Sequence, residues 1–118
     1  MPDPADAQEN EMTETHEIKE YAYYVWGSRP ASLVQANIVM YGAPGHMGAL
    51  WFHDDSSTLP APIRHSAGVY SLHYRMRDFP HIIDMLRNEK PVYLHWDDSY
   101  PTNTRVSTTK EPVGEGGS

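Results

Sequence analysis

Hydrophobic and polar positions alternate with a period of two through residues 68–76 and again through residues 92–97. Aromatic and aliphatic side chains fall on one side of each stretch and mostly polar side chains on the other, a pattern typical of half-buried β-strands. Between the two stretches, Phe79, Ile82 and Leu86 recur at the spacing of one face of an α-helix. The centre of the chain is therefore predicted to form a strand, a helix and a strand with short connections.

The sequence also indicates where this helix begins and ends. Asp78 stands at the expected N-cap, where a carboxylate accepts hydrogen bonds from the free N–H groups of the first turn. Pro80 falls inside that turn, where a missing N–H removes no helical hydrogen bond. Arg87 and Lys90 suit the negative end of the helix dipole, and Pro91 stops the helix.

Three further strands are predicted before this central unit and one after it, over residues 18–27, 33–41, 47–53 and 104–109. Residues 54–67 contain two prolines and no periodicity, and are predicted to be a long loop. The resulting order, β-β-β-β-α-β-β with one helix, indicates an α+β domain. Its helix is expected to cover one face or one end of a small antiparallel sheet that coils strongly or forms a partly open barrel.

The net charge of −7 is concentrated at the N-terminus, because residues 1–20 hold seven acidic side chains against one lysine. Residues 1–17 have almost no large apolar side chains and are predicted to be a disordered acidic tail. A single domain is predicted over residues 18–109, followed by a polar, glycine-rich flexible end at residues 110–118. The nearly neutral domain neither supports nor excludes an anionic partner.

Several classes of function are disfavoured by what the chain lacks. It has no cysteine, which removes disulfides, thiolate metal ligands and thiol catalysis, and which fits a cytosolic protein. No apolar run approaches the roughly 18 residues of a membrane span, and no signal peptide is expected. The nucleophile motif GxSxG, the zinc motif HExxH and glycine-rich phosphate loops are absent. We therefore expect neither an enzyme nor a bound cofactor.

Two predicted strands end in a histidine followed closely by aspartates: His53 before Asp55, and His95 before Asp97. Imidazole and carboxylate ligands suit zinc, manganese or iron, provided that the two strand ends meet. The simpler interpretation is that these aspartates cap turns after the strands, since the spacing matches no metal motif. A metal-dependent activity is accordingly the third hypothesis.

Basic and aromatic residues gather on the outward side of the predicted strand at residues 68–76 and in the loop before it. Arginines beside aromatic rings on an open sheet bind single-stranded nucleic acid or phosphate-bearing ligands by charge and stacking. The candidate ligand-binding residues are Arg64, His73, Arg75 and Arg77, with Tyr93 and His95 if their strands are neighbours. We favour a simpler interpretation of these residues, in which the arginines form ion pairs with nearby carboxylates.

The first predicted strand carries aromatic side chains on both faces, too many to bury on one side of a thin sheet. Tyrosine and tryptophan are enriched where proteins meet. We expect most of the aromatic side chains to pack in the core and an exposed remainder to bind a partner, with Tyr24, Trp26 and Trp51 as the predicted partner-binding residues. The favoured function is a small non-catalytic module of the inhibitor, immunity or adaptor type that binds another protein, or that self-associates through an edge strand. Binding of nucleic acid or a phosphate-bearing ligand is the alternative.

Overall fold

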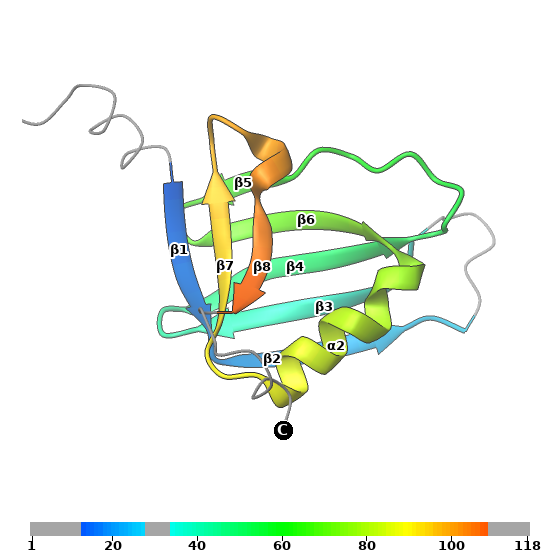
Figure 1. Cartoon of the computed structure of the whole chain (residues 1–118), viewed down its shortest axis with the longest axis horizontal. Helices are drawn as coiled ribbons and strands as arrows, with labels where there is room; N and C mark the ends of the chain where they lie inside the picture. Colours follow the sequence, from blue (N-terminus) through cyan, green and yellow to red (C-terminus); the bar gives the residue numbers. More distant parts are fainter. Residues whose placement is uncertain (1–12, 28–33, 109–118) are drawn as a thin grey trace, which may run out of the picture.

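A computed structural model describes residues 13–27 and 34–108, which form an α+β domain with one α-helix (Figure 1). In chain order the strands are β1 (Thr13–Ile18), β2 (Glu20–Val25), β3 (Val34–Gly42), β4 (Gly45–His53), β5 (Ile63–Ser66), β6 (Val69–Arg75), β7 (Val92–Asp97) and β8 (Arg105–Thr108). The helices are α2 (Phe79–Asn88) and two short 3-10 helices, η1 (Met76–Asp78) and η2 (Pro101–Asn103). The predicted fold class and its single α-helix are confirmed.

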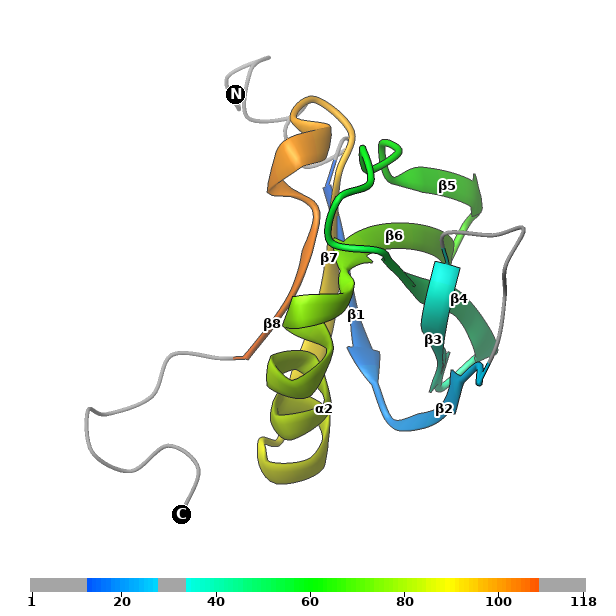
Figure 2. The same cartoon turned by 90° about the vertical axis from the view of Figure 1, so that its right-hand side faces the viewer.

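The strands form two sheets that face each other and do not close into a barrel (Figure 2). Five strands follow the order β2-β3-β4-β6-β5, and three follow the order β1-β7-β8. The strands of one sheet run across those of the other (Figure 1), so their inner faces meet as in an orthogonal sandwich. Lys19 alone separates β1 in one sheet from β2 in the other.

The ordered domain begins before residue 18, where the sequence pattern placed its boundary. Residues 13–18 form β1 and pair with β7 at all six positions, in antiparallel register from Thr13↔Asp97 to Ile18↔Val92. Composition predicted a tail here because β1 carries few large apolar side chains. The remaining predicted tail residues, 1–12, and the predicted C-terminal end, 110–118, lie outside the described residues.

The prediction of an uninterrupted loop over residues 54–67 is wrong, because β5 occupies residues 63–66. All four of its side chains are exposed, so the segment shows no alternation of buried and exposed positions. β5 pairs antiparallel with one side of β6, and β4 pairs parallel with the other side. The sheet is thus mixed, because a long connection lets the chain return to β4 in the same direction.

The helix begins as predicted, with Asp78 at the N-cap position, but it ends at Asn88, three residues before Pro91, and the predicted capping hydrogen bond is not made. Asp78 makes no side-chain capping hydrogen bond and has helical backbone angles, φ −86° and ψ −11°. This follows from η1, which runs directly into α2, whereas a capping residue normally reaches the first amides from an extended backbone.

The core lies between the two sheets and the buried side of α2. Ala36, Ile38 and Met40 of β3 are fully buried, as are Phe52 of β4 and Tyr70 of β6. The helix contributes its buried isoleucines and an edge-on contact of its first aromatic ring with Phe52, at a centroid distance of 4.9 Å. Ala36, Ile38 and Met40 alternate along β3, so these are the side chains that β3 turns toward the core.

Candidate functional site

The outward face of the five-stranded sheet carries a row of side chains that crosses four strands. The register pairs Tyr24 of β2 with Asn37 of β3, Asn37 with Trp51 of β4, and Trp51 with His73 of β6. Opposed residues in paired strands project from the same face. Their neighbours Ile38 and Phe52 alternate with them and point into the core. We call Tyr24, Asn37, Trp51 and His73 the outer row; no helix or strand among the described residues covers it (Figure 2).

The outer row joins residues that the sequence assigned to two different hypotheses. Tyr24 is 53% exposed and Trp51 is half-buried, and both were predicted to bind a partner. His73 was predicted to bind a ligand. Between the two aromatic residues, Asn37 is buried and its Oδ1 has no hydrogen-bond partner among the described residues.

His73 also forms a pair with His53, which lies at the end of β4. Their Nδ1 and Nε2 atoms are 2.8 Å apart. Burial lowers the pKa of His53, and burial followed by the neighbouring His53 lowers the pKa of His73. Both rings are therefore neutral at neutral pH, and one N–H is shared between them. Arg75 stands opposite His53 in the register and adds a cation beside this pair.

The edges of the five-stranded sheet differ sharply. β2 has six residues in uninterrupted register with β3, and Tyr23, Tyr24 and Val25 are 46%, 53% and 57% exposed. β5 has four residues, and its register is shifted between Arg64 and Ser66. Short length, charge and a bulge are devices that discourage further strand pairing at an edge. β5 has all three, whereas β2 carries a glutamate only at its first position.

The remaining predicted ligand-binding residues do not join the outer row. The Nε of Arg64 donates to Glu14 Oε2 at 2.6 Å, so its charge is already paired. The backbone N–H of Arg77 donates to an aspartate in the loop after β4 at 3.0 Å. Tyr93 and His95 belong to β7 in the three-stranded sheet, so the condition that β6 and β7 are neighbours is not met. Trp26, the third predicted partner-binding residue, directly follows β2 and is half-buried.

The residues of the metal hypothesis are likewise held apart. His53 and His95 lie in different sheets, and His95 Nδ1 is 3.1 Å from Thr15 Oγ1. Asp97 accepts hydrogen bonds from Asn103 Nδ2 at 3.1 Å and from the next turn's backbone at 3.0 Å, which lowers its pKa. Within residues 13–27 and 34–108, no three histidine, cysteine or acidic side chains are placed to hold a metal ion.

A polar network that no sequence pattern indicated joins the two sheets. The buried Tyr70 hydroxyl donates to Glu14 Oε1 at 2.7 Å and lies 2.9 Å from His16 Nε2. Because the single phenolic hydrogen points to Glu14, His16 Nε2 carries the hydrogen that it shares with Tyr70. Arg64 closes the network through the second oxygen of Glu14.

Burial, then the hydrogen bond to Glu14, raises the pKa of Tyr70 to about 12. Burial alone would raise the pKa of Glu14, but hydrogen bonds from Tyr70, Arg64 and His16 together lower it. The hydroxyl thus stays protonated and the carboxyl stays ionised over the neutral range. We interpret this network as the attachment of β1 to the five-stranded sheet.

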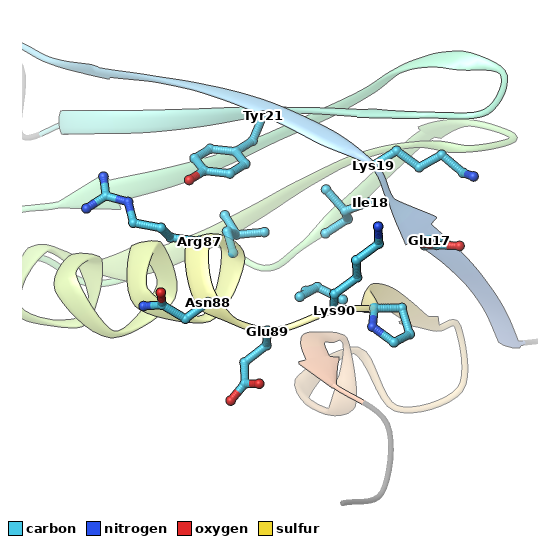
Figure 3. A pocket seen from close by; sticks show the side chains of 11 residues that line it. Glu17, Ile18, Lys19, Tyr21, Arg87, Asn88, Glu89 and Lys90 are labelled. Atoms are coloured by element: carbon cyan, nitrogen blue, oxygen red, sulfur yellow. The ribbon is translucent and has the colours of Figure 1, made fainter. Parts of the chain in front are cut away.

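A pocket of about 370 Å³ lies beside the C-terminal end of α2 (Figure 3). Ile18, Leu86 and Val92 give it an apolar lining. Side chains of both signs surround them, namely Glu17, Lys19, Arg87, Glu89 and Lys90. In Figure 3, Lys90 reaches toward Ile18 whereas Glu89 points away from it. Mixed charge around an apolar lining selects no class of ligand, so the pocket gives no function.

No protein-family model matches this chain, and neither the curated proteins nor the solved structures contain a match to it. No helix in the described residues is long and apolar enough to cross a membrane.

Proposed function

We propose that this protein is a non-catalytic binding module that takes up an extended segment of a protein partner along the free edge of β2, the side that pairs with no other described strand. The observation that carries the proposal is the exposure of three consecutive residues, Tyr23, Tyr24 and Val25, on that edge. Inhibitors, immunity proteins and adaptors act by binding of this kind, and the lack of cysteine supports a cytosolic location.

Strand addition supplies affinity through main-chain hydrogen bonds and specificity through the side chains on either side of the new strand. Tyr23 lies on the inner face of the sheet and touches the first aromatic ring of α2, at a centroid distance of 5.9 Å. Tyr24 lies on the outer face, in one row with Asn37 of β3 and Trp51 of β4. A strand added to β2 would therefore meet an aromatic ring on each of its faces, where aromatic anchors contribute most.

The alternative, a nucleic-acid or phosphate-ligand site, has weaker support. Of the predicted arginines, Arg75 is the one that the register places on the face of the outer row, and Arg64 is paired with Glu14. Binding to nucleic acid depends chiefly on several cations that neutralise phosphates. A metal-dependent activity has no support from the positions of His53 and His95 in separate sheets.

The proposal is tested with a displayed library of short peptides, screened against immobilised protein at nanomolar concentration. We expect enrichment of peptides rich in β-branched and aromatic residues. Val25→Lys adds a charge to the β2 edge and is expected to weaken their binding by at least about tenfold, or ~1.4 kcal/mol. Ile63→Lys is the matched control, because Ile63 is 49% exposed on the opposite edge, and it should leave binding unchanged.

Tyr24→Ala and Trp51→Ala are expected to weaken the same peptides without unfolding the domain, since both side chains lie outside the core. Peptides that bind the Val25→Lys and Ile63→Lys variants equally well would place the site elsewhere and end the proposal. Circular dichroism of each variant separates a lost site from a lost fold.

A further inference from the structure

We infer that the strand added to β2 is the β2 strand of a second copy of this chain, antiparallel, with Tyr23 opposite Tyr23 of the second copy. This inference rests on the proposed function, because it names the occupant of the same edge. It follows from the direction of the backbone groups, the side-chain order of β2 and the charge of the domain.

The hydrogen-bonding direction of β2 is set by its pairing with β3. Val25 is opposite Ala36, and the N–H of the next residue, Trp26, donates to the carbonyl of Gln35 at 3.0 Å. In an antiparallel ladder, bonded and non-bonded pairs alternate along the strand. The even-numbered residues of β2 therefore bond to β3, and the odd-numbered residues point their N–H and C=O groups to the free edge.

Those outward groups belong to Tyr21, Tyr23 and Val25, and they restrict the register of a second copy. A two-fold pairing closes hydrogen bonds only where an odd-numbered residue faces an odd-numbered residue. Centred on Tyr23, the pairing places Tyr21 opposite Val25 and uses all three residues. In a pairing centred on Ala22 or Tyr24, one of these three residues has no outward-pointing residue of the second β2 strand opposite it.

The side chains of β2 suit the register centred on Tyr23. On the outer face Ala22 falls opposite Tyr24 of the second copy, so a small residue meets a large one. Glu20, the one charged residue of β2, falls opposite Trp26 of the second copy rather than opposite another glutamate. Like charges directly opposed across a strand pair are destabilising, and this register has none.

The charge of the domain and its other edges favour a second copy at β2. Residues 13–108 hold eight basic and ten acidic side chains, a net charge of −2, so two copies of the domain repel weakly. β5 and β8 have four residues each, and β1 carries glutamates at two of its six positions. A two-fold interface uses the same surface twice, which requires a self-complementary strand such as β2.

The first test measures mass by sedimentation velocity at roughly 100 μM, where a dimer with a Kd of about 10 μM is mostly assembled. We expect a dimer for the full chain and for Ile63→Lys, and a monomer for Val25→Lys. Val25 is 57% exposed, so this variant keeps the fold while placing a lysine in the pairing. A wild-type monomer at this concentration would overturn the inference.

The second test uses the absence of cysteine, which makes any introduced thiol unique. Opposed residues in a bonded antiparallel pair have Cα atoms about 5.5 Å apart, within the range of a disulfide. Under mild oxidation we expect Tyr23→Cys to form a covalent dimer and Ala22→Cys to remain largely monomeric. Efficient cross-linking of Ala22→Cys instead would overturn the register centred on Tyr23.

Amide hydrogen exchange of the unmodified protein is an independent check, since it requires no substitution. The amides of Tyr21, Tyr23 and Val25 should be protected at high concentration and exchange fast at high dilution. The amides of Ala22 and Tyr24, which bond to β3, should be protected at both. Concentration-independent exchange of the odd-numbered amides would contradict the dimer.

The outcomes also separate this inference from the proposed function. A monomeric chain whose selected peptides are lost in Val25→Lys would leave strand addition standing and reject only the second copy. A monomeric chain that selects no such peptides would reject both.

Discussion

The loss of one oxygen atom tests whether the network around Tyr70 holds β1 in place. Tyr70→Phe removes the hydroxyl that donates to Glu14 Oε1 at 2.7 Å and that accepts from His16 Nε2 at 2.9 Å. The ring itself is fully buried and packs on Trp96 at a centroid distance of 5.6 Å, a contact that phenylalanine keeps. The substitution therefore removes polar contacts and almost no apolar packing.

The expected magnitude follows from the charge of the acceptor. A hydrogen bond to an ionised group contributes roughly 1.5–3 kcal/mol, and a buried group left without its partner adds to the loss. The Glu14 side chain is 26% exposed, so water replaces part of the lost hydrogen bond. We expect Tyr70→Phe to lower the free energy of unfolding by about 2 kcal/mol. In a domain of this size, that corresponds to a fall in Tm of roughly 8 °C.

The assay is urea denaturation of the wild type, Tyr70→Phe, Glu14→Gln and the double variant. Because the two residues share one hydrogen bond, their losses should be less than additive in this cycle. Arg64→Gln is the control; it removes the exposed hydrogen bond to Glu14 Oε2 and leaves the bond between Tyr70 and Glu14 in place, so its loss should be the smallest. A Tyr70→Phe loss no larger than that of Arg64→Gln would refute the attachment of β1 through this network.

The pH dependence of the same variants adds a signed expectation. The pKa of Glu14 is lowered from 4.5 in the folded state, so its stabilisation is present above that value and is lost as the pH falls through the folded pKa. The pKa of Tyr70 is raised from 10.0 to about 12, so its stabilisation is complete below pH 10.0 and is lost as the pH rises through about 12. Both dependences should be absent in the double variant.

Three further substitutions test other parts of the structure. Gly48 has a φ of +100°, and a Cβ there would stand 1.8 Å from a carbonyl oxygen of β6. Gly48→Ala should therefore lower the free energy of unfolding, measured by urea denaturation, by about 3 kcal/mol or more. Gly27, with nothing within 4 Å of its Cβ position, is its control. Leu94 is fully buried, so Leu94→Ala should lower the free energy of unfolding, measured by calorimetry, by roughly 2–5 kcal/mol. The pKa values of His53 and His73 are lowered from 6.5 in the folded state. The stability that this pair confers is therefore present above pH 6.5 and is lost as the pH falls through the folded pKa values. The urea midpoint of His73→Gln should vary less with pH across that range than the midpoint of the wild type.

The sequence by itself determined the local elements and most of the core. Alternation along residues 68–76 identified β6, and the spacing of Phe79, Ile82 and Leu86 identified α2. These features are local, because burial on one face imposes a period of two on a strand and of 3.6 on a helix. β5 was missed for the same reason, since all of its side chains are exposed and no period marks it.

Only the tertiary structure decided which strands are neighbours, and the candidate site depends on that. Tyr24, Asn37, Trp51 and His73 form one row because β2, β3, β4 and β6 lie side by side, an order that none of the strands encodes alone. Tyr93 was separated from this face because its strand joined the other sheet. The physical reason is that strand order and register follow from how the apolar faces of the whole chain pack together. The pairing of Glu14 with Tyr70, 56 residues away, likewise exists only once the two sheets meet.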